Sequence, residues 1–160
     1  MLLLLVRHAI AAEQDGEKYP DDTLRPLVAK GRRIQVRMTG RLAKEGLAPD
    51  RVFSSPWRRA WQTARIILEE TGLSKKKRIA CQALTEPPNL TALAEEIGEI
   101  GAEERVALVG HEPWMGQLAA LLLTGQASSL NVDFPKSGIM GIETDRIEPG
   151  AGVLQFFWRP

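Results

Sequence analysis

Short apolar runs alternate along the chain with longer stretches in which apolar residues recur at helical spacing. Leu2–Val6 and Arg105–Val109 are nearly continuous apolar runs of strand length, typical of parallel strands buried on both faces of a sheet. Six segments are predicted strands: residues 2–6, 51–54, 79–81, 105–109, 138–144 and 153–158. The last two are expected to form an antiparallel edge or hairpin.

The stretches between these strands predict helices with recognisable ends. Ile34, Met38 and Leu42 form the apolar stripe of the first, which Gly46 can end. The second is expected to be capped by Ser55 and to begin at Pro56, and the others to begin after Asn89 and at Pro113. Gly72 and Gly125 are the expected ends of the second and fourth helices. Strands alternating with helices predict a three-layer α/β/α sandwich, with a mostly parallel central sheet and helices on both faces. No linker or repeat interrupts the pattern, so one domain is expected over residues 1–160.

Composition narrows the possible partners. With 160 residues, 44% hydrophobic and 26% charged, the chain has globular rather than disordered or fibrous composition. The formal charge of +1 lacks the basic excess of most nucleic-acid-binding proteins, so no nucleic-acid partner is expected. The single cysteine, Cys81, cannot form an intrachain disulfide, which favours a cytoplasmic location. The leucine-rich start is too short to span a bilayer and lacks a basic leader, so a buried strand and no membrane partner are expected.

The only two histidines, His8 and His111, each follow a predicted buried strand. Ligands of open α/β sheets bind at the carboxyl ends of the strands, so both imidazoles are expected at one edge with Arg7 and Arg59. Guanidinium groups bind phosphate through a planar fork, and histidine can act as a covalent nucleophile. The pattern therefore predicts a site for a phosphoryl group.

Other chemistries fit the sequence less well. His111-Glu112 begins like a zinc-protease motif, but Met115 stands where the second histidine is required. No Walker A sequence and no Gly-x-Ser-x-Gly motif occurs, and two histidines with one cysteine make a structural zinc site improbable. We therefore expect neither a metal nor a cofactor.

Helical spacing separates Arg59 from its neighbour Arg58. Arg58 shares a polar helix face with Gln62 and Arg65, whereas Arg59 lies beside the apolar face. Arg58 is therefore expected on the surface. Three tryptophans, Trp57, Trp61 and Trp114, can rim a pocket for a protein substrate, although packing is the commoner use of tryptophan.

Three motifs together resemble the histidine phosphatase superfamily, which has the phosphoglycerate mutase-like fold. They are Leu4-Leu5-Val6-Arg7-His8-Ala9, Ser54-Ser55-Pro56 with Arg59-Ala60 and Gln62-Thr63-Ala64, and Val109-Gly110-His111-Glu112-Pro113. The small size and Leu24-Arg25-Pro26-Leu27 are similar to the SixA phosphohistidine phosphatases. The resemblance implies that His8 is the nucleophile and that Arg7, Arg59 and His111 bind the phosphoryl group. Ala9 replaces a frequent glycine, and Val28 replaces a frequent threonine, so a helix cap or contact is expected to be lost there.

Two further residues are weaker candidates. Glu86 lies in a proline-rich loop, about where larger superfamily members carry a proton donor, but a solvated carboxylate is an equal alternative. SixA-like members commonly lack an acid there, and an imidazole leaving group is readily protonated near neutral pH. Arg25 precedes the first helix and either reaches the phosphate or pairs on the surface.

These observations favour a metal-independent phosphatase that acts through a phosphohistidine on His8. The expected substrate is phosphohistidine in a signalling protein, for which a histidine phosphotransfer domain is one partner. A phosphatase of small phosphate esters is the first alternative. A non-catalytic phosphoprotein-binding module is the second, and the complete set of Arg7, His8, Arg59 and His111 argues against it.

Overall fold

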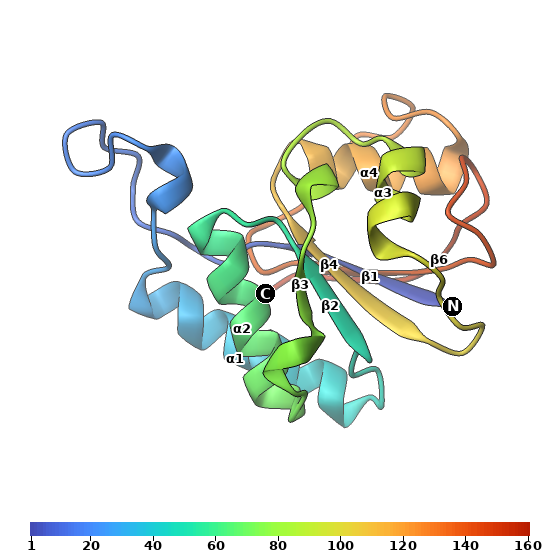
Figure 1. The fold of residues 1–160 in the computed structure, drawn as a ribbon, viewed down its shortest axis with the longest axis horizontal. Coiled ribbons are helices and arrows are strands. Elements are labelled where there is room, and N and C mark those ends of the chain that lie inside the picture. The colour runs from blue at the N-terminus through green and yellow to red at the C-terminus, as the bar shows by residue number, and fades with distance from the viewer.

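A computed structural model describes residues 1–160, in which a six-stranded sheet is covered by four α-helices (Figure 1). The strands are β1 (Leu2–Arg7), β2 (Arg51–Ser54), β3 (Arg78–Ala80), β4 (Arg105–Gly110), β5 (Ile139–Glu143) and β6 (Val153–Trp158). The helices are α1 (Ala29–Lys44), α2 (Arg58–Thr71), α3 (Leu90–Ile97) and α4 (Trp114–Thr124). None of the helices combines the length and the hydropathy that crossing a lipid bilayer requires.

The strand order is β3-β2-β4-β1-β5-β6. Strands β1 to β4 are parallel to one another, whereas β5 pairs antiparallel with β1 and β6 pairs antiparallel with β5. The sheet is thus mostly parallel with an antiparallel edge, which confirms the predicted three-layer α/β/α architecture.

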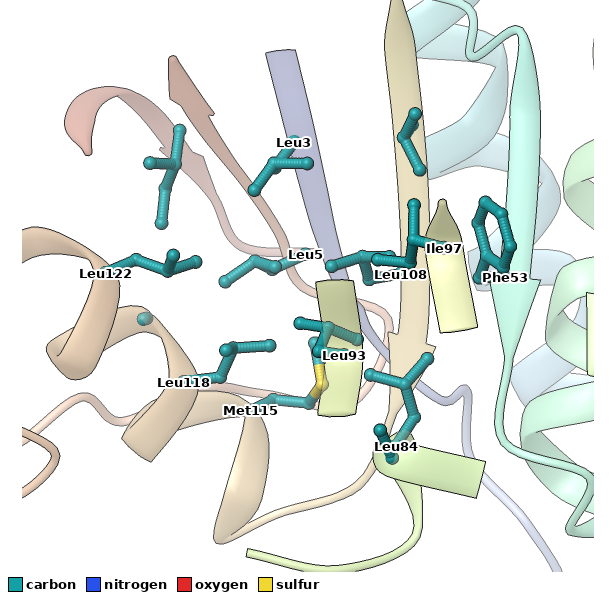
Figure 2. Packing of buried hydrophobic residues seen from close by; sticks show 14 of the residues in the cluster. Leu3, Leu5, Phe53, Leu84, Leu93, Ile97, Leu108, Met115, Leu118 and Leu122 are labelled. Carbon is teal, nitrogen blue, oxygen red and sulfur yellow. The ribbon is translucent and has the colours of Figure 1, made fainter. Parts of the chain in front are cut away.

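The residues of β1 alternate between two separate cores. Leu3 and Leu5 belong to the larger core, in which α3 and α4 pack on one face of the sheet (Figure 2). Leu4 and Val6 belong to the second, in which α1 and α2 cover the opposite face. All four side chains are fully buried, as the continuous apolar run predicts for a central strand.

Helix ends follow the sequence signals with one exception. Gly72 and Gly125 end α2 and α4 in the left-handed conformation, at φ of 71° and 84°. Helix α2 begins at Arg58 rather than at the expected Pro56, and Ser55 does not cap it. Val28, at the N-cap of α1, makes no side-chain hydrogen bond to the helix, so the expected loss of a cap is confirmed.

The carboxyl ends of three neighbouring strands lie at one edge of the sheet. The register places Arg7 of β1 opposite Gly110 of β4, and the His8 amide donates a hydrogen bond to the Gly110 carbonyl at 3.0 Å. The Ser55 amide, after β2, donates to the Val109 carbonyl at 3.0 Å. The loop from β1 to α1 projects beyond this same edge (Figure 1). The backbone therefore brings the loops that carry both histidines together.

Candidate active site

A cavity of about 680 Å³ opens at this edge of the sheet. It is lined by Arg7, His8, Ile10, Ala11, Ala12, Glu13, Gln14, Arg25, Trp57, Arg59, His111, Glu112, Trp114 and Lys136. The structure thus places five of the six sequence candidates in one cavity and leaves Glu86 outside it. Cationic side chains outnumber carboxylates here, so the cavity suits an anionic ligand.

His8 is held in one tautomer by its own loop. Its Nδ1 lies 2.7 Å from the Ala9 carbonyl oxygen, which can only accept, so Nδ1 carries the proton. The side chain is 6% exposed, and this burial, with the charges of Arg59 and Arg7 as smaller contributions, lowers the pKa of His8 to about 3. At neutral pH, Nε2 therefore carries a free lone pair, as a nucleophile requires.

His111 is also buried but is bound through its other ring nitrogen. Its Nε2 lies 2.8 Å from the Ser55 hydroxyl oxygen, and its Nδ1 has no hydrogen-bond partner. The ring centroids of His111 and His8 are 5.1 Å apart. Burial first, and then the charges of His8 and Arg59, lower the pKa of His111 to about 2. A hydroxyl can donate or accept, so this bond leaves His111 either tautomer.

Arg7 and Arg59 each keep a buried Nε without a hydrogen-bond partner. An Arg7 terminal nitrogen donates to the Phe134 carbonyl at 2.7 Å, and an Arg59 terminal nitrogen donates to the Asp22 carbonyl at 2.8 Å. Burial lowers the pKa of both groups, but guanidinium remains charged in proteins. Two desolvated cations with spare donors, next to a neutral imidazole, form a receptor for a phosphoryl dianion. Arg58, in contrast, is exposed, as helical spacing predicts.

Arg25 lines the cavity and forms a salt bridge with Asp22. Asp22 was not among the residues predicted from the sequence. The Arg25 Nε donates to the Asp22 carboxylate at 2.6 Å, and an Arg59 terminal nitrogen reaches the other carboxylate oxygen at 3.0 Å. The hydrogen bond from Arg25 is the main cause that lowers the pKa of Asp22. One carboxylate therefore holds both guanidiniums beside the cavity. The spacing of three residues between Asp22 and Arg25 is the only sequence signal for this pair.

Helix α2 fixes the loop that carries His8. The Thr63 hydroxyl accepts a hydrogen bond from the Ala9 amide at 3.0 Å and donates to the Arg59 carbonyl at 2.8 Å. The Gln62 side chain accepts from the Leu27 amide at 2.8 Å. Two adjacent polar residues of one helix therefore position both ends of the cavity loop relative to Arg59.

The two carboxyl groups near the site occupy different environments. Glu86 is exposed and lines a separate small crevice, which it shares with Trp114. Glu112 lines the main cavity, and burial raises its pKa, while its hydrogen bond from the Gly116 amide at 2.9 Å opposes that shift. Glu112 directly follows His111, and this adjacency was the available signal for it.

Lys136 and two tryptophans complete the cavity wall. Burial, and then the charges of Arg7 and Arg25, lower the pKa of Lys136. Trp57 lies against His111 with ring centroids 4.5 Å apart, and Trp114 contacts both of these rings edge-on. Packing alone was the favoured interpretation of these tryptophans, but both also line the cavity.

No three side chains of His, Cys, Asp or Glu gather closely enough to hold a metal ion. The charged groups that line the cavity are mostly arginine and lysine, which do not ligate metals under ordinary conditions. The positive charge that faces the cavity comes from the side chains of Arg7, Arg25, Arg59 and Lys136.

Comparison with known proteins identifies the family. Residues 3–86 match the model of the histidine phosphatase superfamily, branch 1. The chain is also 33% identical over 146 residues to an uncharacterized protein of a Picosynechococcus species, covering 90% of this chain and 86% of the relative. The chain belongs to the histidine phosphatase superfamily, and this membership supports phosphatase activity.

Solved structures show the same fold. The protein histidine phosphatase SixA in complex with tungstate superimposes with a TM-score of 0.78 at 24% identity, covering 100% of this chain and 97% of that one. A candidate phosphohistidine phosphatase SixA from Agrobacterium tumefaciens gives 0.77 at 23% identity, with 99% and 97% covered. A mycobacterial glucosyl-3-phosphoglycerate phosphatase gives 0.69 at 19% identity, with 96% of each chain covered. The fold is therefore shared by proteins named for protein and for small-molecule substrates.

Proposed function

We propose that residues 1–160 form one histidine phosphatase domain, which removes phosphoryl groups from phosphohistidine side chains of a cytoplasmic signalling protein. The observation that carries this proposal is the neutral His8, whose free Nε2 is enclosed in a cavity with Arg7 and Arg59. The likeness to SixA structures in fold supports the choice of phosphohistidine over other phosphoryl groups.

The first step is transfer of the phosphoryl group to His8. The Nε2 lone pair attacks phosphorus while the bond from phosphorus to the leaving nitrogen breaks, and the leaving group keeps that electron pair and takes up a proton. Arg7, Arg59 and His111 face the cavity and stabilise the charge on the equatorial oxygens. The Ala9 carbonyl stabilises the positive charge that forms on the imidazole ring of His8.

The second step is hydrolysis of the phosphoenzyme. Water attacks phosphorus, the bond to Nε2 breaks, and inorganic phosphate leaves with His8 again neutral. A low pKa makes His8 a good leaving group, because the ring has little tendency to keep an added positive charge. Burial therefore keeps the Nε2 lone pair free of a proton for the first step and eases the departure of His8 in the second, while the Ala9 carbonyl stabilises the charged ring between them.

The two carboxyl groups near the site differ in how well they are placed to protonate a leaving group. The role of Glu86 as proton donor stays a prediction, and its exposed position outside the cavity gives it no direct path to a bound phosphoryl group. Glu112 faces the cavity and has a raised pKa, so it is the better-placed source of a proton. An imidazole leaving group needs little such help, whereas an alkoxide needs a strong acid.

A parallel hydrolysis assay tests the substrate class. The purified protein is given a phosphohistidine-containing phosphotransfer domain and a panel of alkyl phosphates, with and without exhaustive chelation. We expect hydrolysis of phosphohistidine that survives chelation, because arginines supply the charge that metals supply elsewhere. Efficient alkyl phosphate turnover would instead favour the small-ester alternative. Phosphate binding without hydrolysis of any substrate would favour the binding-module alternative.

A further inference from the structure

We propose that Trp114 forms an aromatic subsite that binds a planar leaving group, so that the protein prefers phosphoryl groups bonded to an aromatic ring. This inference rests on the proposed phosphatase function and adds a specificity-determining residue to it. The subsite is the part of the cavity wall formed by Trp114 and the adjoining Trp57.

The four tryptophans differ in what covers their rings. A guanidinium lies over Trp61 at 4.1 Å and over Trp158 at 3.9 Å, and Arg59 lies 4.8 Å from the Trp57 centroid. Trp114 has no guanidinium over it and no ring stacked on it. Its two aromatic contacts, with Trp57 and His111, are edge-on at interplanar angles of 71° and 86°. Trp114 is therefore the tryptophan that the fold leaves free of cation and stacking partners.

Trp114 lines two hollows. One is the catalytic cavity, and the other is the small crevice that Glu86 and Pro88 also line. The residue is half-buried, so part of its surface stays accessible. A large apolar ring in the wall of a cationic cavity does not bind phosphate, but it can bind an apolar group attached to the phosphate.

Displacement geometry places the leaving group near this surface. The attacking and leaving atoms lie roughly in line across phosphorus, so the leaving group points away from His8. His8 and His111 are 6% and 3% exposed, whereas Trp57 and Trp114 are half-buried. The direction away from the buried nucleophile is therefore toward the more open part of the cavity that Trp114 lines.

Ring chemistry then decides which leaving groups benefit. Aromatic pairs favour offset-stacked or edge-to-face contacts with centroids about 4.5–7 Å apart. The imidazole of phosphohistidine and the ring of an aryl phosphate both satisfy that requirement, whereas an amine or an alkyl alcohol does not. Such a contact corresponds to a preference of about 3- to 10-fold.

The test compares two small substrates and follows how their ratio changes between the wild type and variants of Trp114. Phosphoimidazole and phosphoramidate both carry a phosphorus–nitrogen bond, but only the first has an aromatic leaving group. We expect Trp114→Leu to lower the preference for phosphoimidazole, measured as the ratio of the two kcat/KM values, by about 3- to 10-fold through KM. Trp114→Phe should restore most of it. Trp61→Leu, outside the cavity, is the matched control and should leave the ratio unchanged.

Binding of both compounds to the His8→Ala variant, measured by calorimetry with and without Trp114→Leu, separates this inference from the proposed function. A binding preference that depends on Trp114 supports the subsite even where the wild type hydrolyses neither these compounds nor the phosphohistidine protein, an outcome that would refute the phosphatase proposal alone. If Trp114→Leu lowers kcat/KM equally for both substrates, their ratio stays unchanged. That result would show that Trp114 acts only in packing and would overturn the inference.

Discussion

The loops after β1 and β4 each present a buried histidine to the same cavity, yet the two rings are held in opposite ways. His8 is bound through Nδ1 to a carbonyl of its own loop, which leaves Nε2 free. His111 is bound through Nε2 to the hydroxyl of Ser55, a residue of a third loop, and its Nδ1 lacks a partner. Burial lowers the pKa of both rings.

This difference teaches that burial alone does not define a nucleophile. Both imidazoles are neutral at physiological pH, so charge state does not distinguish them. What distinguishes them is the partner of the second ring nitrogen, because a carbonyl fixes the tautomer and a hydroxyl does not. We therefore assign the covalent step to His8 and a hydrogen-bonding role to His111, and the following experiments examine that division.

The largest effect is expected for His8→Ala. Loss of the only ring with a free, tautomer-fixed Nε2 should abolish turnover, while the fold persists because the side chain belongs to neither large core. Acid-labile labelled phosphoenzyme, trapped by rapid quench, should appear in the wild type and be missing from the variant. Substantial turnover by His8→Ala would refute the covalent mechanism.

A smaller loss is expected for His111→Gln, which keeps hydrogen-bonding capacity but alters its position. Removal of one group that stabilises transition-state charge commonly costs about 10²- to 10³-fold in kcat. Labelled phosphoenzyme should still form, more slowly, since His8 is intact. If a folded His111→Gln variant forms no phosphoenzyme even at long times, His111 is required for the covalent step and the assigned roles of the two histidines are wrong.

The two carboxyl groups extend the comparison to the neighbours of the histidines. Glu112→Gln should lower hydrolysis of phenyl phosphate by about 10²-fold, because the leaving oxygen loses a cavity-facing acid. Glu86→Gln, assayed on the same phenyl phosphate, is the matched control. On phosphohistidine, Glu86→Gln should lower hydrolysis by less than about tenfold. A loss of about 10³-fold for Glu86→Gln would identify Glu86 as the acid and require the 85–89 loop to move.

The pH dependence of stability tests the burial of both histidines without an activity assay. Folding lowers the pKa of His8 from 6.5 to about 3 and that of His111 from 6.5 to about 2. Between these values and 6.5, the unfolded chain therefore binds more protons than the folded chain. The free energy of unfolding should therefore fall as pH drops below 6.5, by up to about 1.4 kcal/mol per pH unit for each histidine. Urea unfolding between pH 6.2 and 4.8 measures this slope. His111→Gln should remove about half of it, and an unchanged slope would contradict the assigned burial.

Periodicity and chain direction predicted most of what positions the site. The apolar runs of β1 and β4 indicate buried strands, and the residues that follow parallel strands lie at one edge of the sheet. The structure adds that β1 and β4 are neighbours. Helical spacing also separated the buried Arg59 from the exposed Arg58. These inferences succeed because they depend on local repeats and on chain direction.

Contacts between loops were beyond such reasoning. Asp22 pairs with Arg59 across 37 residues, and Lys136 enters the cavity from the segment before β5. Neither lies in a periodic element, so no repeat in the sequence indicates its direction. The start of α2 was misplaced for a similar reason, because the Ser55 hydroxyl accepts a hydrogen bond from the Trp57 amide and pairs with His111 instead of capping the helix.

The shared carboxylate of Asp22 also bears on how the cavity is emptied. Arg25 and Arg59 face a permanent internal anion, so part of their charge is already neutralised before a phosphoryl group arrives. An uncompensated pair of guanidiniums would hold inorganic phosphate strongly and slow its departure. Because Asp22 occupies donors of both guanidiniums, we expect it to weaken product binding while it keeps both cations in place. Weaker binding of inorganic phosphate would speed its release.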